Sequence, residues 1–284
     1  MGKSWKRLFS VLAVALACAT VAALRGGGAR PVLRAGWPVN VGHRGASVRF
    51  PENTLASFRA ALEAGAGGLE LDVRVTRDGH PVVMHDATVD RTTDGSGAVA
   101  GMTLAEVRRL DAGQSDAGEP VPTLREVLTE FPGVSVNVDI KDTRLPGAEE
   151  IVLDMLRGAG ATGRVLVASP SHRLLRRFRK VGGGECDTGA SRAEVGVFWG
   201  LSLLRLERLT RPAYAALQVP INYGPLPLVT PRFVRAAHSR GVRVDAWTIN
   251  DAGQMRTLLD LGVDSIMTDR PEELTKVLGH RTPG

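Results

Sequence analysis

The stretch LELDVRV at residues 69–75 alternates apolar and charged residues without a break, and VSVNVDIK at residues 134–141 alternates apolar and polar residues in the same way. A period of two predicts β-strands, with Glu70 and Asp72 on one face of the first strand and Asp139 on the polar face of the second. In a parallel sheet, helices cover apolar outer faces, so these polar faces would point inward. The alternative is an antiparallel sheet whose polar face lies in solvent.

The rest of the chain repeats a unit of helix, glycine and short strand. TLRE at residues 123–126 is typical of a helix N-terminus, and so is the Thr-Pro pair at residues 230–231. We predict strands at residues 39–42, 69–75, 134–141, 165–169, 184–188, 217–221, 242–250 and 265–268, of which 184–188 has the weakest pattern. About eight such units in about 250 residues predict an α/β fold of the TIM (β/α)8 barrel type. A doubly wound sheet is disfavoured because no G-x-G-x-x-G motif follows the first strand.

The net charge of +6 comes from 36 Lys+Arg residues and 30 Asp+Glu residues, but it is unevenly distributed. Residues 1–34 contain six of the basic residues and no acidic one, so residues 35–284 carry no net charge. A domain that binds duplex nucleic acid needs an excess of cations, so we expect no nucleic-acid partner. The two cysteines exclude a disulfide framework and a cysteine-rich zinc site.

An apolar run, LFSVLAVALACATVAAL, occupies residues 8–24 and follows three basic residues. This pattern predicts a signal peptide or an uncleaved membrane anchor within residues 1–34, which also include a short linker. In either case we expect the remaining domain, residues 35–280, to be exported. It would then be extracellular, or anchored to the membrane and held outside the cytoplasm.

Two histidines end apolar stretches, His43 in VGHRG and His85 in PVVMHD. Histidine titrates near neutral pH, so such a pair suits a general base and a general acid. Inside a barrel, Glu70, Asp72 and Asp139 would repel one another unless positive charge lay among them. A divalent cation that prefers oxygen ligands supplies that charge, so we expect a metal site beside the histidines.

Short motifs occur in a fixed order along the chain. They are HRG (43–45), PENT (51–54), ELD (70–72), HD (85–86), DRTT (90–93), DIK (139–141), WTIN (247–250), GVD (262–264) and TDRP (268–271). Together they resemble the glycerophosphodiester phosphodiesterase family, within the phospholipase C-like phosphodiesterase superfamily, and the resemblance covers roughly residues 39–278. The resemblance implies a TIM barrel with a small insertion after the second strand, at about residues 87–114.

The resemblance also implies a set of site residues. One divalent cation, Ca²⁺ or Mg²⁺, would be held by Glu70, Asp72 and Asp139, the last in place of the family's usual glutamate. His43 and His85 would be the two catalytic histidines, and we interpret His43 as the base and His85 as the acid.

The implied activity is metal-dependent hydrolysis of glycerophosphodiesters to sn-glycerol 3-phosphate and an alcohol, in glycerophospholipid catabolism. Arg44 and Lys141 would bring positive charge to the substrate phosphate. Glu52 would orient a histidine or complete the metal shell, and Trp247 would line the mouth or pack inside the fold. Asn53 would either join the site or cap the helix that follows it.

Residues 171–211 are the part least similar to the family. A basic cluster at residues 172–180 precedes a leucine-rich stretch at residues 197–209, a pattern that indicates contact with a lipid surface. The alternative activity is therefore a lysophospholipase D-like hydrolysis of membrane lysophospholipids, unless this part is an ordinary barrel helix packed on the sheet. A non-catalytic glycerophosphodiester-binding surface protein is a further alternative, which the paired histidines disfavour. The sequence indicates no oligomeric state.

Overall fold

The computed structural model describes residues 37, 39–113, 118–141 and 145–280. The hydrophobic segment at residues 1–34 lies outside this part of the chain, so the prediction of a signal peptide or anchor stays a prediction. Among the described residues, no helix combines the length and the apolar character that a membrane crossing requires.

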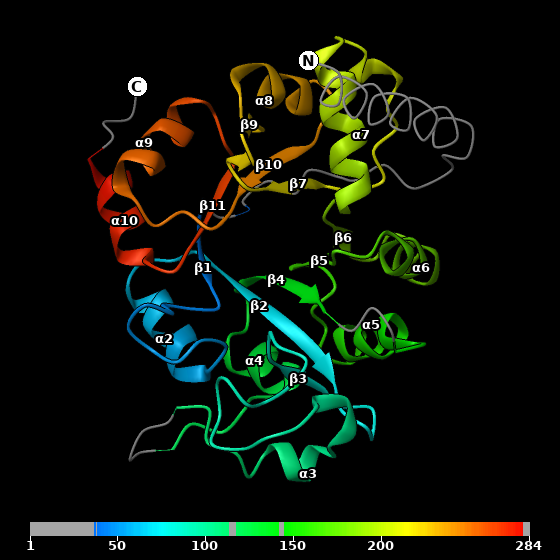
Figure 1. The fold of residues 1–284 in the computed structure, drawn as a ribbon, viewed down its shortest axis with the longest axis vertical. Helices are drawn as coiled ribbons and strands as arrows, with labels where there is room; N and C mark the ends of the chain where they lie inside the picture. Colours follow the sequence, from blue (N-terminus) through cyan, green and yellow to red (C-terminus); the bar gives the residue numbers. More distant parts are fainter. Residues whose placement is uncertain (1–36, 38, 114–117, 142–144, 281–284) are drawn as a thin grey trace, which may run out of the picture.

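Eight parallel strands form a ring, which Figure 1 shows in a view along the barrel axis. In chain order they are β1 (Asn40–His43), β2 (Gly68–Val75), β4 (Ser135–Ile140), β5 (Val165–Ala168), β6 (Asp187–Thr188), β7 (Ala216–Val219), β10 (Arg243–Ala246) and β11 (Ser265–Thr268). The strands pair in the order β6-β5-β4-β2-β1-β11-β10-β7, in which β1 pairs with both β2 and β11. A single parallel bridge between Gly189 and Ala216 joins the remaining two strands. The predicted TIM barrel is thus confirmed.

Helices surround the strands on the outside of the ring. They are α2 (Leu55–Glu63), α4 (Leu124–Glu130), α5 (Ala148–Gly158), α6 (His172–Gly182), α7 (Arg192–Leu203), α8 (Pro231–His238), α9 (Ala252–Asp260) and α10 (Pro271–Gly279), with a short 3₁₀ turn, η2 (Glu207–Leu209), after α7. Thr123 and Glu126 form the capping box of α4, and Thr230 precedes a proline at the start of α8, as the sequence predicts.

Two excursions leave the barrel. After β2 the chain forms β3 (Pro81–Val83), antiparallel to β2, and then η1 (Val99–Gly101) and α3 (Leu104–Val107), which pack on a small core of their own. This first excursion lies at the bottom of Figure 1. After β7 a hairpin of β8 (Asn222–Tyr223) and β9 (Leu226–Pro227) precedes α8.

The alternating residues of β2 and β4 face as predicted for a parallel barrel. Leu69, Leu71 and Val73 are fully buried in the main hydrophobic core beneath the helices. The residues between them point into the ring, where Glu70 and Asp72 are also buried. The alternative of a polar face in solvent is therefore wrong.

Two predicted strands were too long. The stretch predicted as 242–250 pairs only as far as Ala246, because the chain then bends away and Asn250 binds the end of β11 instead. The weak strand at 184–188 is reduced to the two residues of β6. Beyond β10 the side chain of Asn250 contacts the end of β11, and before β6 the side chain of Glu185 binds Arg157 in the last turn of α5.

Candidate active site

The site lies at the carboxyl ends of β1, β2 and β4, which are neighbours in the ring. The register places His43 beside Glu70 across β1 and β2, and Asp72 beside Asp139 across β2 and β4. Four chemically active side chains therefore come together from strands that are well separated in sequence. This is the end of the barrel at which TIM-barrel enzymes carry out catalysis.

Three carboxylates form the centre of the site. Oxygen atoms of Glu70, Asp72 and Asp139 all lie within 4.8 Å of one another. Burial raises the pKa of Glu70 to about 7, and the negative charge of Asp72 adds to this shift. Burial likewise raises the pKa of Asp139. Clustered carboxylates of this kind are stable only with positive charge close by.

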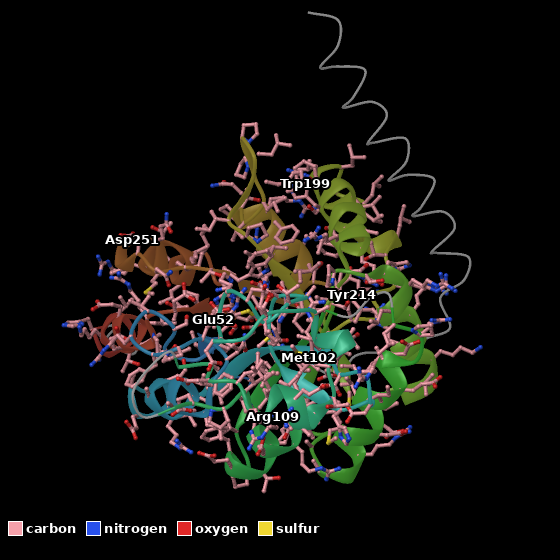
Figure 2. All side chains as sticks on the ribbon, turned by 60° about the horizontal axis from the view of Figure 1, so that its bottom comes forward. Glu52, Met102, Arg109, Trp199, Tyr214 and Asp251 are labelled. Carbon is pink, nitrogen blue, oxygen red and sulfur yellow. The ribbon has the colours of Figure 1, made fainter. Side chains whose placement is uncertain are left out.

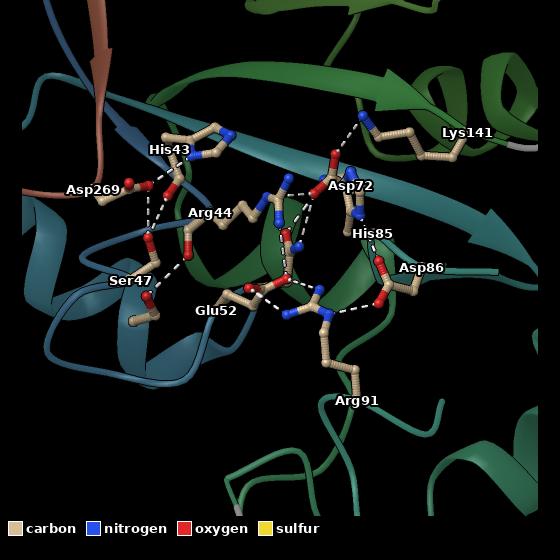
Figure 3. Close-up of polar contacts among 12 residues, drawn as sticks. His43, Arg44, Ser47, Glu52, Asp72, His85, Asp86, Arg91, Lys141 and Asp269 are labelled. Carbon is tan, nitrogen blue, oxygen red and sulfur yellow. Dashed lines mark hydrogen bonds and ion pairs between the residues drawn. The ribbon is translucent and has the colours of Figure 1, made fainter. Parts of the chain in front are cut away.

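Two cationic side chains supply part of that charge, as Figure 3 shows. Lys141 Nζ lies 2.9 Å from Asp72 Oδ1 and 2.5 Å from Asp139 Oδ2, and Arg44 Nε lies 3.0 Å from Asp72 Oδ2. Burial opposes ionisation of Asp72, but Lys141 and Arg44 outweigh it and hold the pKa of Asp72 below its usual range. Burial also opposes protonation of Lys141, yet the two aspartates raise its pKa.

The carboxylate centre fits a divalent cation. Asp139 Oδ1 is buried without a hydrogen-bond partner, although a buried carboxylate oxygen normally has one. Three carboxylates within 4.8 Å offer the oxygen donors that Ca²⁺ and Mg²⁺ prefer. Asp139, although shorter than a glutamate, thus still reaches the other two acids.

The two ring nitrogens of His43 face different carboxylates, and the closer of these is Asp269. Its Nδ1 lies 2.7 Å from Asp269 Oδ1, and its Nε2 lies 3.8 Å from Glu70 Oε2. Asp269 also accepts hydrogen bonds from Ser47 Oγ at 2.9 Å and from Asn250 Nδ2 at 2.7 Å. Burial alone would lower the pKa of His43, but the charge of Glu70 and the hydrogen bond to Asp269 raise it.

His85 has an analogous but more exposed arrangement. Its Nδ1 lies 2.6 Å from Asp86 Oδ1, and Asp86 Oδ2 accepts a hydrogen bond from Arg91 Nε at 2.6 Å. Arg91 also binds both oxygens of Glu52, at 3.0 and 2.7 Å. Glu52 in turn accepts a hydrogen bond from Arg44 Nη1 at 3.0 Å. A chain of ion pairs thus links the first excursion to the centre of the site.

The structure decides several of the open interpretations. Glu52 lies outside the three-carboxylate cluster and contacts Arg44 and Arg91, so it supports His85 only indirectly. Asn53 is a site residue, because its Nδ2 donates to Asp72 Oδ2 at 2.9 Å, whereas the cap of α2 is Thr54. Trp247 is 41% exposed at the end of β10, so it is not packed inside the fold.

Three further residues complete the site, and sequence reasoning assigned none of them a role. Asp86 and Asp269 hold the two histidines, and Arg91 holds Asp86. All three occur within the short motifs HD, TDRP and DRTT. A carboxylate directly after a histidine at a strand end was a usable signal for Asp86. The contact between Asp269 and His43 spans 226 residues and has no local signal.

The chain is similar to known proteins over most of its length. A profile of the glycerophosphoryl diester phosphodiesterase family matches residues 43–273. A glycerophosphodiester phosphodiesterase of Caldanaerobacter subterraneus is 36% identical over 246 residues, which is 84% of this chain and 96% of that protein. A probable glycerophosphodiester phosphodiesterase 2 of Mycobacterium tuberculosis is 37% identical over 263 residues, 89% of this chain and 96% of that protein.

Solved structures share the fold. A phosphodiesterase of Oleispira antarctica, in complex with the product sn-glycerol-3-phosphate, matches with a TM-score of 0.66 and 28% identity, over 84% of this chain and 96% of that one. A glycerophosphodiester phosphodiesterase of Thermotoga maritima matches with a TM-score of 0.67 and 27% identity, over 84% of this chain and 98% of that one.

Proposed function

The chain belongs to the glycerophosphoryl diester phosphodiesterase family and is a phosphoric diester hydrolase, and from this premise we propose that it converts glycerophosphodiesters to sn-glycerol 3-phosphate and an alcohol by acid–base catalysis with two histidines. One observation carries the proposal. Each of two strand-end histidines has its Nδ1 against a carboxylate, and the two rings lie on either side of the Arg44 and Asp72 side chains (Figure 3). A protein that only binds its ligand needs no such pair.

Glu70, Asp72 and Asp139 would hold one divalent cation, Ca²⁺ or Mg²⁺. When bound, such an ion stabilises negative charge on phosphate oxygens as a Lewis acid. Arg44 and Lys141 border the same carboxylates and are positioned to bind the non-bridging oxygens of the phosphate. Glu52 and Asp72 hold the Arg44 guanidinium beside the carboxylates, where its positive charge would face those oxygens.

The two histidines move the protons. His43 Nε2 takes the proton of the water whose oxygen forms the new bond to phosphorus, while Asp269 accepts from Nδ1–H and stabilises the imidazolium that forms. As the bond between phosphorus and the departing oxygen breaks, His85 Nε2 gives its proton to that alcohol, and Asp86 fixes its ring through Nδ1. The support is the shared geometry of the two rings, in which a carboxylate holds Nδ1 and Nε2 remains for the substrate.

Glycerophosphocholine hydrolysis tests the assignment. His43→Ala and His85→Ala should each abolish turnover and leave the thermal unfolding midpoint close to that of the wild type. His80→Ala is the matched control, because His80 is half exposed on a loop. Full activity in either active-site variant would disprove the acid–base proposal.

Chelation tests the metal separately. A chelator should remove activity, and added Ca²⁺ or Mg²⁺ should restore it to the wild type but not to Asp139→Asn. Activity unchanged by the chelator would exclude metal dependence.

We further propose that the enzyme acts outside the cytoplasm in the breakdown of glycerophospholipids. The support is the basic and apolar segment at residues 1–34, which is typical of exported proteins. Cell fractionation with antibody detection tests this. Recovery of the full-length chain in the cytoplasm alone would contradict it.

A further inference from the structure

Exposed large apolar side chains are concentrated in a few segments of the described chain. Ten such side chains are exposed among the described residues, and all but Val181 lie after β1, β7 or β10 or at and after the end of α7. Six of them come from two neighbouring segments and form what we call the apolar rim: Leu203, Leu204, Leu206, Leu209, Tyr223 and Leu226. Leu209 is 59% exposed and Tyr223 is 74% exposed, values that a protein avoids for large apolar groups unless they have a partner.

The two segments of the apolar rim lie at the same end of the molecule. Arg232, in the first turn of α8, donates to Ser202 O at 3.0 Å and to Glu207 Oε2 at 2.5 Å. The end of α7 therefore contacts the start of α8, directly after the β8–β9 hairpin. Figure 2 shows the hairpin and the part of α7 near Trp199 rising together on one side of the molecule.

The sequence left two interpretations of residues 171–211, contact with a lipid surface or an ordinary barrel helix packed on the sheet. Helix α6 packs in the ordinary way, with Leu174, Leu175 and Phe178 buried. Its Arg179 is bound by Glu194, so part of the basic cluster at residues 172–180 is neutralised. Interpretation of this region as a packed barrel helix thus holds for α6 and for Phe198 and Leu201 of α7, whereas the leucines at residues 203–209 are exposed.

The charges between the leucines are positive. Arg205, Arg208 and Arg211 are exposed, whereas Glu207 is buried and paired with Arg232. Leucine and tyrosine interspersed with arginine match the interface of an anionic phospholipid bilayer. A symmetric contact between two copies would instead place the same patch against itself and bring these arginines together.

We propose that the apolar rim inserts into the headgroup region of an anionic phospholipid membrane and holds the mouth of the barrel against it. The site then receives the phosphodiester headgroup of a lipid that carries a single acyl chain. This substrate assignment rests on the proposed function, whereas membrane contact by the apolar rim does not.

The first experiment measures contact without using activity. Hydrogen–deuterium exchange is recorded on the full chain, with and without vesicles of equal parts phosphatidylcholine and phosphatidylglycerol. Three proteins are compared: the wild type, the double variant Leu204→Glu/Leu209→Glu, and Val181→Glu, which places the same charge on an exposed apolar residue away from the mouth. Vesicles should slow exchange at residues 203–209 and 222–227 in the wild type and in Val181→Glu, but not in the double variant.

The second experiment measures turnover of two substrates by the same proteins. Each acidic substitution removes a leucine from the membrane, so the double variant should hydrolyse lysophosphatidylcholine in these vesicles at least about tenfold more slowly than Val181→Glu. Glycerophosphocholine in solution should be hydrolysed equally by all three, which also shows that the double variant is folded.

The outcomes separate the two proposals. Absence of glycerophosphocholine hydrolysis in the wild type defeats the proposed function, while the exchange data still decide membrane contact. Equal slowing of exchange in all three proteins, or none in the wild type, overturns the inference. The inference is also overturned if the wild type is a dimer, the double variant is a monomer, and vesicles change exchange in neither. The apolar rim would then be a subunit interface. Equal hydrolysis of vesicle-borne lysophosphatidylcholine by all three overturns the substrate assignment.

Discussion

Replacement of Asp269 by asparagine tests whether a partly buried carboxylate fixes the ring of His43. In the structure this carboxylate contacts His43 Nδ1 at 2.7 Å and accepts hydrogen bonds from Ser47 Oγ at 2.9 Å and Asn250 Nδ2 at 2.7 Å. Asparagine has nearly the same shape, so the substitution removes the charge and one acceptor without leaving a cavity.

The size of the stability loss follows from the pKa of Asp269. Burial alone would raise that pKa, but the hydrogen bonds with His43 and Asn250 lower it from 3.8 to about 2. One pKa unit corresponds to about 1.4 kcal/mol, so the ionised carboxylate contributes about 2 kcal/mol to the free energy of unfolding. Because the pKa is lower in the folded state, this contribution is complete above about pH 4 and is lost as the pH falls toward 2.

An amide also conflicts with the donor it meets. Asn250 Oδ1 accepts hydrogen bonds from Thr268 Oγ1 and from the backbone N–H of Asp269, so its Nδ2 must point at the carboxylate. If the new asparagine accepts from His43 Nδ1–H, its own NH₂ faces that Nδ2, and two donors oppose each other. An unsatisfied buried donor costs about 1–3 kcal/mol, which adds to the lost charge.

We therefore expect Asp269→Asn to lower the unfolding free energy at pH 7 by about 2–4 kcal/mol and to lower kcat about 100-fold through misorientation of His43. Denaturant unfolding and glycerophosphocholine turnover measure the two effects. Ser47→Ala is the control, because it removes one hydrogen bond to Asp269 but keeps the carboxylate. Wild-type turnover in Asp269→Asn would refute the reasoning, and so would an equal loss in both variants.

The remaining predictions concern the cations of the site. Lys141→Met leaves Asp72 and Asp139 without their shared ammonium, so the unfolding free energy should fall by about 3 kcal/mol, and added Ca²⁺ should raise the melting temperature more in this variant than in the wild type. No stabilisation of either protein by Ca²⁺ would show that the cation does not bind these carboxylates. Arg91→Ala should lower kcat about tenfold through Asp86, with little change in melting temperature because Arg91 is half exposed. Unchanged kcat would show that Asp86 orients His85 unaided.

The sequence was sufficient for the barrel and for the centre of the site because both depend on local patterns. Alternation in β2 determines which residues face inward, and strand register then places Asp72 beside Asp139 without further information. The histidines could be found because each ends an apolar strand. None of these inferences requires knowledge of contacts between distant segments.

The supporting residues could not be found in this way. Asp269 reaches His43 only because β11 pairs with β1, a contact that closes the ring between the two ends of the domain. Arg91 lies on an excursion whose path over the site is determined by packing of its own small core. The solvent exposure of Leu203–Leu209 was equally hidden, since the composition of this segment matches that of a packed helix.

The unequal support of the two histidines leads to a test of which one is the acid. The departing alcohol of glycerophosphocholine needs a proton, whereas p-nitrophenolate is a stable anion and leaves without one. If His85 is the acid, His85→Ala should lose glycerophosphocholine hydrolysis but keep most of its activity on glycerophospho-p-nitrophenol. His43→Ala should lose both activities, because both reactions need the base. The reverse pattern would exchange the roles. Asp269, which is less exposed than Asp86, would then support the acid.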